Sequence, residues 1–155
     1  MRFLGNIEAK TDAKGRAFLP STFRRQLQSA GEERLMLRKD IFQECLVLYP
    51  ESVWNEQEDA LRSRLSRWNK QQQNVFRQFV REAIEVTLDG NGRFLIPKRY
   101  LQMANIEQDI VFIGVGNTIE IWSNKNASEP FVDDDALSKA IEDLMSDNNE
   151  TSANE

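Results

Sequence analysis

The chain has 155 residues, of which 40% are hydrophobic and 29% charged, with a formal net charge of −5. This length fits one moderate domain, and the composition is that of a globular protein. No apolar run approaches the roughly 18 residues of a membrane span, and the first residues lack the apolar core of a secretory signal. With Cys45 as its single cysteine the chain forms no internal disulfide, so we expect a cytoplasmic protein with no membrane partner.

The sequence contains no histidine. Its absence excludes Ser–His–Asp and Cys–His catalysis and most zinc sites. Neither a phosphate-binding glycine loop nor a dinucleotide fingerprint is present. We therefore expect a protein that is not an enzyme, with no catalytic residue, no metal site and no cofactor.

The charge is distributed unevenly along the chain. Residues 1–102 carry 18 basic and 13 acidic side chains, a net charge of +5, whereas residues 103–155 carry 2 basic and 12 acidic ones, a net charge of −10. A binding partner responds to the local field, which salt screens within about 10 Å. The overall acidity is therefore compatible with binding to nucleic acid.

Residues 1–50 predict a compact β-rich unit. Ile7, Ala9 and Thr11 alternate with polar residues, which is the pattern of a half-buried strand. A glycine turn, a second strand, a short helix after Pro20 and two further strands follow in chain order (12–15, 16–19, 21–27, 34–38 and 45–49). About 45 residues are too few for an independent core, so this unit needs a partner.

Residues 51–83 predict a pair of helices. Apolar side chains recur every three or four residues in two groups, with a predicted break at 69–73 (Trp54, Leu61, Leu65 and Trp68; Val75, Phe76, Phe79, Val80 and Ala83). The aromatic side chains are expected in a core or an interface. The arginines of segment 62–81 are expected on an exposed helical face or at a subunit contact.

Residues 84–125 repeat the first unit. At an offset of 77, residues 7–23 align with 84–100 without a gap and share six identities in 17 positions. These identities include Asp12, Gly15 and Arg16, which recur as Asp89, Gly92 and Arg93 (the others are Ile7/Ile84, Glu8/Glu85 and Pro20/Pro97). Strands at 110–114 and 118–122 complete the second copy, and the two copies are expected to pack about a pseudo-twofold axis.

Residues 126–155 form an acidic tail. The sequence predicts a polar linker, a helix start at Asp133, a short apolar stripe over 137–145 and a disordered end from Ser146.

Three motifs give the chain a family resemblance. Asp-x-x-x-Arg with a proline four residues later occurs twice, Leu-Tyr-Pro-x-x-x-Trp stands at 48–54, and Gly-Val-Gly-Asn-x-Ile-Glu-Ile-Trp stands at 114–122. Together, over residues 1–125, they resemble the MraZ family. The resemblance implies an α+β fold with duplicated SpoVT/AbrB-like β units of the swapped-hairpin type, in pseudo-twofold symmetry, with the helical pair inserted between them.

The resemblance also implies a function. MraZ proteins are bacterial transcriptional regulators that assemble into homo-oligomeric rings, octamers or dodecamers, and are not enzymes. They bind direct repeats in double-stranded DNA upstream of the division and cell-wall gene cluster and associate with the nucleoid. By position, the family's functional motif falls on Asp12 and Arg16 and on Asp89 and Arg93 of this chain.

The candidate DNA-binding residues are basic and lie mainly in the first copy (Lys10, Lys14, Arg16, Arg24, Arg25 and Arg93). Arginine can bond phosphate or the guanine edge through two parallel bonds, and a lysine at a turn tip suits phosphate. Asp12, Gly15, Asp89 and Gly92 are assigned to organising the turns. An alternative reading is that each Asp and Arg only bond each other and stiffen the turn.

A second class of function stays open beside DNA binding. The tail helix and its acidic flanks favour an oligomeric scaffold or an antitoxin-like protein-interaction module that does not read DNA.

In a ring, many copies of a weak DNA reader would gain affinity from successive direct repeats. Such repeats suit head-to-tail subunits, whereas a twofold dimer suits palindromes.

Overall fold

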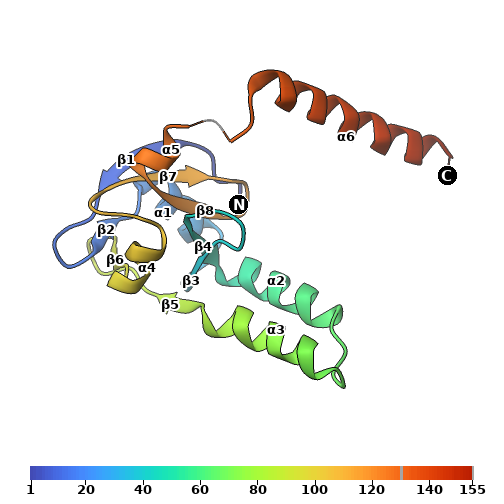
Figure 1. Ribbon diagram of the computed structural model, residues 1–155. Coiled ribbons are helices and arrows are strands. Elements are labelled where there is room, and N and C mark those ends of the chain that lie inside the picture. Colours follow the sequence, from blue (N-terminus) through green and yellow to red (C-terminus); the bar gives the residue numbers. More distant parts are fainter. Residues whose placement is uncertain (130, 155) are drawn as a thin grey trace.

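The computed structural model describes residues 1–129 and 131–154, and this part of the chain is an α+β fold (Figure 1). Each copy contains the predicted strand, strand, helix, strand, strand order. The first copy contains β1 (Asn6–Lys10), β2 (Arg16–Phe18), α1 (Ser21–Ser29), β3 (Leu35–Lys39) and β4 (Leu46–Pro50). The second contains β5 (Ile84–Val86), β6 (Arg93–Leu95), α4 (Lys98–Met103), β7 (Asp109–Gly114) and β8 (Ile119–Ser123).

The main sheet is antiparallel and has the strand order β1-β7-β8-β4-β3-β5. The first strand of each copy pairs with the third strand of the other copy, β1 with β7 and β5 with β3. Exchanging every strand for its counterpart gives the same order read backwards. The sheet is therefore pseudo-twofold symmetric, with the axis at the Val47–Glu120 pair.

A separate two-stranded ribbon joins the second strands of the copies, β2 and β6. Its central pair is Ala17 and Phe94, which are equivalent in the repeat. Symmetric backbone bonds extend it, because the N–H of Ile96 donates to Gly15 O at 2.9 Å and that of Leu19 to Gly92 O at 3.0 Å. The ribbon thus lies on the same pseudo-twofold axis.

One core serves both copies. Phe23 of α1 and its equivalent Tyr100 of α4 are both buried in it. Phe94 of the ribbon packs edge-on against Phe112 of the main sheet, with the ring centroids 6.3 Å apart. Neither copy encloses this core by itself, which agrees with the expectation that each unit needs the other.

An α-helical arm leaves the sheet between the copies, formed by α2 (Glu51–Ser63) and α3 (Lys70–Arg81) (Figure 1). At its base Trp54 and Phe79 stack nearly parallel, with centroids 5.3 Å apart. The predicted break at 69–73 is wrong. Residues 64–69 connect the helices, because the Asn69 side chain accepts the N–H of Gln72 at 3.0 Å and so caps the start of α3. Trp68 therefore leaves the predicted stripe and is 92% exposed.

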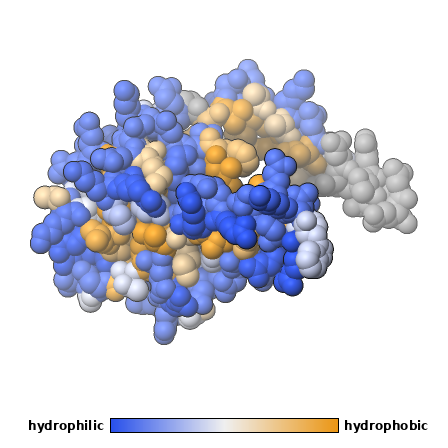
Figure 2. Space-filling view, turned by 60° about the horizontal axis from the view of Figure 1, so that its bottom comes forward, coloured by the Kyte–Doolittle hydropathy of each residue, from blue (hydrophilic) through white to orange (hydrophobic). Residues whose placement is uncertain are grey.

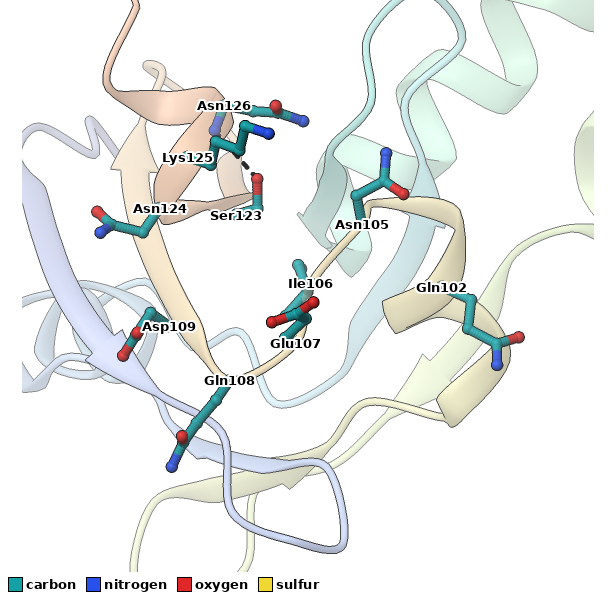
Figure 3. A pocket seen from close by; sticks show the side chains of 10 residues that line it. All are labelled: Gln102, Asn105, Ile106, Glu107, Gln108, Asp109, Ser123, Asn124, Lys125 and Asn126. Atoms are coloured by element: carbon teal, nitrogen blue, oxygen red, sulfur yellow. Dashed lines mark hydrogen bonds between the residues drawn. The ribbon is translucent and has the colours of Figure 1, made fainter.

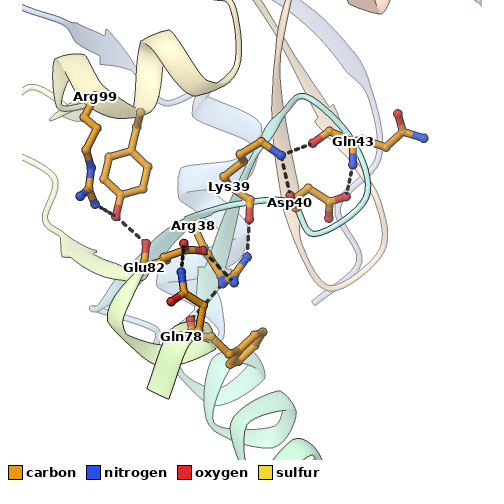
Figure 4. A network of polar contacts seen from close by, with 9 residues as sticks. Arg38, Lys39, Asp40, Gln43, Gln78, Glu82 and Arg99 are labelled. Atoms are coloured by element: carbon orange, nitrogen blue, oxygen red, sulfur yellow. Dashed lines mark hydrogen bonds and ion pairs between the residues drawn. The ribbon is translucent and has the colours of Figure 1, made fainter. Parts of the chain in front are cut away.

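Arg38 of β3 fixes the base of the arm and is only 6% exposed (Figure 4). Its guanidinium donates to Phe79 O at 3.1 Å, to Lys39 O at 2.6 Å and to the Glu82 carboxylate at 3.2 Å. It also lies 4.6 Å from the centroid of the Phe79 ring. The Tyr100 hydroxyl donates to the carbonyl of Glu82, so the same turn is bonded to both copies.

The tail is more helical than the sequence predicts. The polar stretch after β8 contains α5 (Asn124–Ala127), and the tail helix, α6, spans Asp134–Asn154 rather than ending near 145. Asp133 caps α6 as expected, since its carboxylate accepts the N–H of Ala136 at 2.8 Å. In Figure 1 α6 extends away from the sheet. No helix in the described part of the chain has the length and apolar character needed to cross a bilayer.

Candidate nucleic-acid interface

The two Asp-x-x-x-Arg turns have the same hydrogen-bond pattern. Asp12 Oδ1 accepts the backbone N–H groups of Lys14 and Arg16, both at 2.9 Å, and Oδ2 accepts Nε of Arg16 at 2.7 Å. In the second copy Asp89 Oδ1 accepts two backbone N–H groups at 2.9 Å, and Oδ2 accepts Nε of Arg93, also at 2.9 Å. Each aspartate thus closes its turn and holds the arginine that follows.

Hydrogen bonds stabilise the ionised form of both aspartates. The pKa of Asp12 lies below its ordinary value, chiefly because the backbone N–H of Arg16 donates to the carboxylate. The pKa of Asp89 is lowered in the same way by the backbone N–H of Arg93. Each turn therefore pairs a fixed anion with a fixed cation at neutral pH.

Glycine is required at the fourth position of each turn. Gly15 has φ +88° and Gly92 has φ +82°, a region that L side chains rarely adopt. A Cβ on Gly15 would lie 2.6 Å from the carbonyl oxygen of Ile96, the residue directly after β6 of the ribbon. The turn and the ribbon are therefore locked together by close backbone contact.

Both arginines keep their terminal nitrogens available. In the described part of the chain, the hydrogen bonds of the Arg16 and Arg93 side chains use Nε, and none uses Nη1 or Nη2. The side chains of Arg16 and Arg93 are 36% and 28% exposed. An arginine anchored through Nε can still donate two parallel bonds from its outer edge.

The two arginines share one face of the β2–β6 ribbon. Arg16 pairs with Leu95 and Arg93 with Phe18, while Ala17 and Phe94 between them are buried. Side chains alternate across a strand, so the four flanking residues lie on the opposite, outer face. We call this face, formed by Arg16, Phe18, Arg93 and Leu95, the ribbon face.

Arg24 lies beside the second turn, although it belongs to the first copy. Its Nε donates to Leu19 O at 3.0 Å, and its Nη1 lies 2.6 Å from where a Cβ of Gly92 would stand. The equivalent residue, Leu101, packs against Gly15 at the first turn. In the sequence Arg24 belongs to the basic stretch of the first copy. In the fold its side chain lies at the turn of the second copy.

The first turn has lysines of both copies near it. Lys14 of the turn and Lys98 of α4 line one depression with Gly15 and Leu101. Lys98 is absent from the sequence-based candidates, and its place directly after Pro97, opposite the first turn, emerges only from the pairing of β2 with β6. Each end of the ribbon therefore has an arginine of its own and at least one further cation.

Two candidates lie apart from this arrangement. Lys10 ends β1, and its ammonium pairs with Asp109 of the neighbouring strand at 3.8 Å. Arg25 is on another side of α1 from Arg24, in a depression lined also by Met1 and Ser29. The structure thus brings Lys14, Arg16, Arg24 and Arg93 to the two ends of the ribbon, but not Lys10 or Arg25.

A polar depression lies between the α4–β7 connection and α5 (Figure 3). Its lining is mostly amide and charged side chains (Gln102, Asn105, Ile106, Glu107, Gln108, Asp109, Ser123, Asn124, Lys125 and Asn126). The Ser123 hydroxyl accepts the N–H of Asn126 at 3.1 Å, so it caps α5.

In the part of the chain that the structure covers, no three His, Cys, Asp or Glu residues cluster as a metal site would require.

Cys45 is fully buried, and burial raises the pKa of its thiol. A thiol in this environment stays protonated and is a poor nucleophile.

Comparison with known proteins agrees with these features. Residues 2–78 and 79–139 each match the family model described as "MraZ protein, putative antitoxin-like". The chain is 61% identical to "Transcriptional regulator MraZ" of Phocaeicola vulgatus over 149 residues, which are 96% of this chain and 97% of that protein.

Two other relatives carry the same name. The Bacteroides fragilis protein is 57% identical over 155 residues, 100% of this chain and 98% of its own length. The Shewanella oneidensis protein is 37% identical over 123 residues, 79% of this chain and 80% of its own. With its duplicated fold, its paired Asp-x-x-x-Arg turns and these relatives, the chain belongs to the MraZ family.

Proposed function

We propose that this protein is a transcriptional regulator that binds double-stranded DNA through the ribbon face. One observation carries the proposal: Arg16 and Arg93 are both anchored through Nε on one exposed face. Their terminal nitrogens have no hydrogen-bond partner among the residues described. The names of the relatives, each "Transcriptional regulator MraZ", support the same function.

The shape and charge of this face suit a groove of DNA. A two-stranded β-ribbon fits the major groove, where arginine bonds O6 and N7 of guanine. Lys14 and Lys98 beside the first turn, and Arg24 beside the second, are placed to contact phosphates on either side. Phosphate contacts would set the register, and the two arginines would read bases.

We further propose that the protein acts as a homo-oligomeric ring on direct repeats upstream of the division and cell-wall gene cluster. Such a protein would work in the cytoplasm, at the nucleoid, without catalysing a reaction. The family resemblance supports this assembly, and exposed apolar side chains are available for subunit contacts at the arm, with Trp68 the most exposed. Several copies on successive repeats would raise affinity by about 10²–10⁴.

The strand exchange between copies supports the SpoVT/AbrB-like, swapped-hairpin assignment, since β1 and β5 each pair with the other copy. We accordingly propose a division into a first repeat (1–50), a helical insert (51–83), a second repeat (84–125) and an acidic tail (126–155).

The test compares binding of the protein to the DNA upstream of its own gene and to a shuffled duplex of equal composition. Fluorescence anisotropy at two salt concentrations would measure both affinities, and sedimentation would measure assembly size. We expect tighter binding to the upstream DNA at both salt concentrations. Equal affinity for the two duplexes would contradict a sequence-specific regulator.

The second candidate function is an oligomeric scaffold or antitoxin-like module. It is favoured by the tail, where α6 exposes Leu137, Ile141 and Leu144 along one stripe. If the protein stays oligomeric but binds neither duplex even at low salt, this candidate replaces the first. A related role for the acidic tail is to occupy the basic surface in place of DNA. Removal of residues 126–155 tests this role, and an unchanged DNA affinity would contradict it.

A further inference from the structure

Two apolar side chains alternate with the two arginines on the ribbon face. Phe18 is 57% exposed and Leu95 is 52% exposed, and each pairs across the ribbon with one of the arginines. They are equivalent by the pseudo-twofold symmetry, one contributed by each copy. Large apolar side chains gathered on a polar face mark a contact surface. Apolar areas between hydrophilic ones are also visible on the side of the molecule that Figure 2 turns toward the viewer.

The four side chains form a compact patch. Residues directly opposite in an antiparallel pair have Cβ atoms about 5 Å apart, and diagonal neighbours about 7–8 Å apart. Arg16 is opposite Leu95 and Arg93 is opposite Phe18, so the two arginines are diagonal neighbours. Base pairs rise about 3.4 Å each, so the patch spans two to three base pairs. Both apolar side chains thus lie within about two base pairs of a guanine held by either arginine.

We propose that Phe18 and Leu95 contact the 5-methyl groups of thymines beside the guanines that Arg16 and Arg93 bond. This inference rests on the proposed function and names the DNA that the site selects: duplexes with thymine within about two base pairs of each contacted guanine. The thymine methyl is the apolar group that bases present in the major groove. Each side chain exchanges its exposed apolar surface for contact with that group.

Phe18 also supports the neighbouring arginine. The Cζ atom of Arg93 lies 5.8 Å from the centroid of the Phe18 ring. A cation over an aromatic face is attracted to it, which restricts the guanidinium. Phe18 thus both contacts the base and steadies Arg93, whereas Leu95 gives Arg16 no such support.

The test removes the methyl groups from the DNA and the side chains from the protein. The upstream duplex is prepared once with thymine and once with uracil, which lacks only the 5-methyl group. The full-length wild type, the Phe18→Ala/Leu95→Ala double variant and Phe42→Ala are each titrated against both duplexes. Phe42, 88% exposed in the β3–β4 connection, is a matched control for loss of an exposed phenylalanine.

The wild type and Phe42→Ala should bind the uracil duplex more weakly, by about fourfold for each methyl contact. The double variant should bind the thymine duplex more weakly than the wild type and lose nothing further on uracil. A double variant that matches the wild type on both duplexes would overturn the inference and leave the proposed function in place.

Two further results would also overturn it. A change of assembly size in the double variant, measured by sedimentation, would place the ribbon face between copies of the chain. Failure of the wild type to bind the thymine duplex would remove the proposed function and the inference together.

Discussion

The Asp12 carboxylate holds Arg16 by its Nε, with 2.7 Å between Oδ2 and Nε, while Oδ1 of the same carboxylate closes the turn. Asp89 holds Nε of Arg93 and closes the second turn in the same way. Anchoring at Nε reduces the rotamer freedom that each arginine would otherwise lose on binding. The structural interpretation of this motif and the proposed DNA-binding role are therefore compatible, because the Asp–Arg bond holds the guanidinium in place for the proposed contact.

Asp12→Ala should weaken DNA binding although Asp12 itself donates nothing to DNA. A simple charge argument gives the opposite sign, because the variant removes a carboxylate from the surface that we propose to face DNA phosphates. Asp12→Asn keeps an acceptor for the backbone N–H groups and should fall between the wild type and Asp12→Ala. Anisotropy titrations at one salt concentration measure all three. Tighter binding by Asp12→Ala would contradict the positioning role.

Gly15→Ala should mainly lower the stability of the fold, whereas Gly92→Ala should mainly lower DNA affinity. At Gly15 the new Cβ meets the backbone oxygen of Ile96, so we expect a loss of about 1–3 kcal/mol in unfolding free energy. At Gly92 it meets the end of the Arg24 side chain, which can move away. Gly92→Ala should therefore lose less stability but lower DNA affinity by displacing Arg24. Urea unfolding and titration measure the two effects, and equal stability losses would contradict this assignment.

The two aspartates of the turns should make the free energy of unfolding depend on pH in the acid range. The folded-state pKa values of Asp12 and Asp89 lie below the ordinary 3.8, so the folded chain binds these protons less tightly than the unfolded chain. Their contribution is present above pH 3.8 and is lost as the pH falls through the lower, folded-state values. The Asp12→Asn/Asp89→Asn variant should show a shallower loss of the urea midpoint as the pH falls below 3.8. An unchanged slope would contradict this.

Arg38→Ala should destabilise the junction between sheet and arm. The substitution removes donors from Phe79 O, Lys39 O and the Glu82 carboxylate, all at a buried position. We expect a loss of about 2–4 kcal/mol in unfolding free energy, measured by urea titration. Arg77→Ala is the matched control, since Arg77 is exposed on the same arm and bonds only Asn74 in the described part of the chain. Equal losses in the two variants would contradict the role of Arg38.

The units of the fold were predictable because local patterns determine them. Period-two alternation at Ile7 and Ala9, the glycine turn and Pro20 act within a few residues, and the repeat supplies each signal twice. The exchange of β1 and β5 between copies was not predictable in this way. The same apolar alternation fits a partner strand in either copy, and only the shared core decides between them.

The errors have local physical causes as well. The Asn69 side chain starts α3 earlier than hydrophobic spacing suggests, which leaves Trp68 in the connection. The burial of Arg38 has no sequence signal, because its partners are carbonyls and a carboxylate that other elements bring to it. The tail helix α6 extends through polar residues that composition alone assigns to disorder.

In the candidate site too, local motifs identify some residues, whereas the pairing between the copies decides the position of others. Arg16 and Arg93 could be selected from the repeated motif, which lies within five residues. The position of Arg24 at the second turn, of Lys98 at the first, and of Phe18 beside Arg93 depends on the β2–β6 pairing between copies. Linear clusters of charge therefore included most of these cations but could not show that Arg24 lies at the second turn.

The most direct test of the account is the affinity of wild type, Arg16→Ala and Arg16→Lys for the upstream DNA at two salt concentrations, with assembly size measured alongside. We predict that Arg16→Ala keeps its assembly size and loses about 5- to 150-fold in affinity. Arg16→Lys should keep the salt dependence of the wild type but lose preference for upstream over shuffled DNA, because lysine lacks the two-pronged guanidinium. Binding of all three proteins with equal affinity and equal preference would contradict base reading by Arg16.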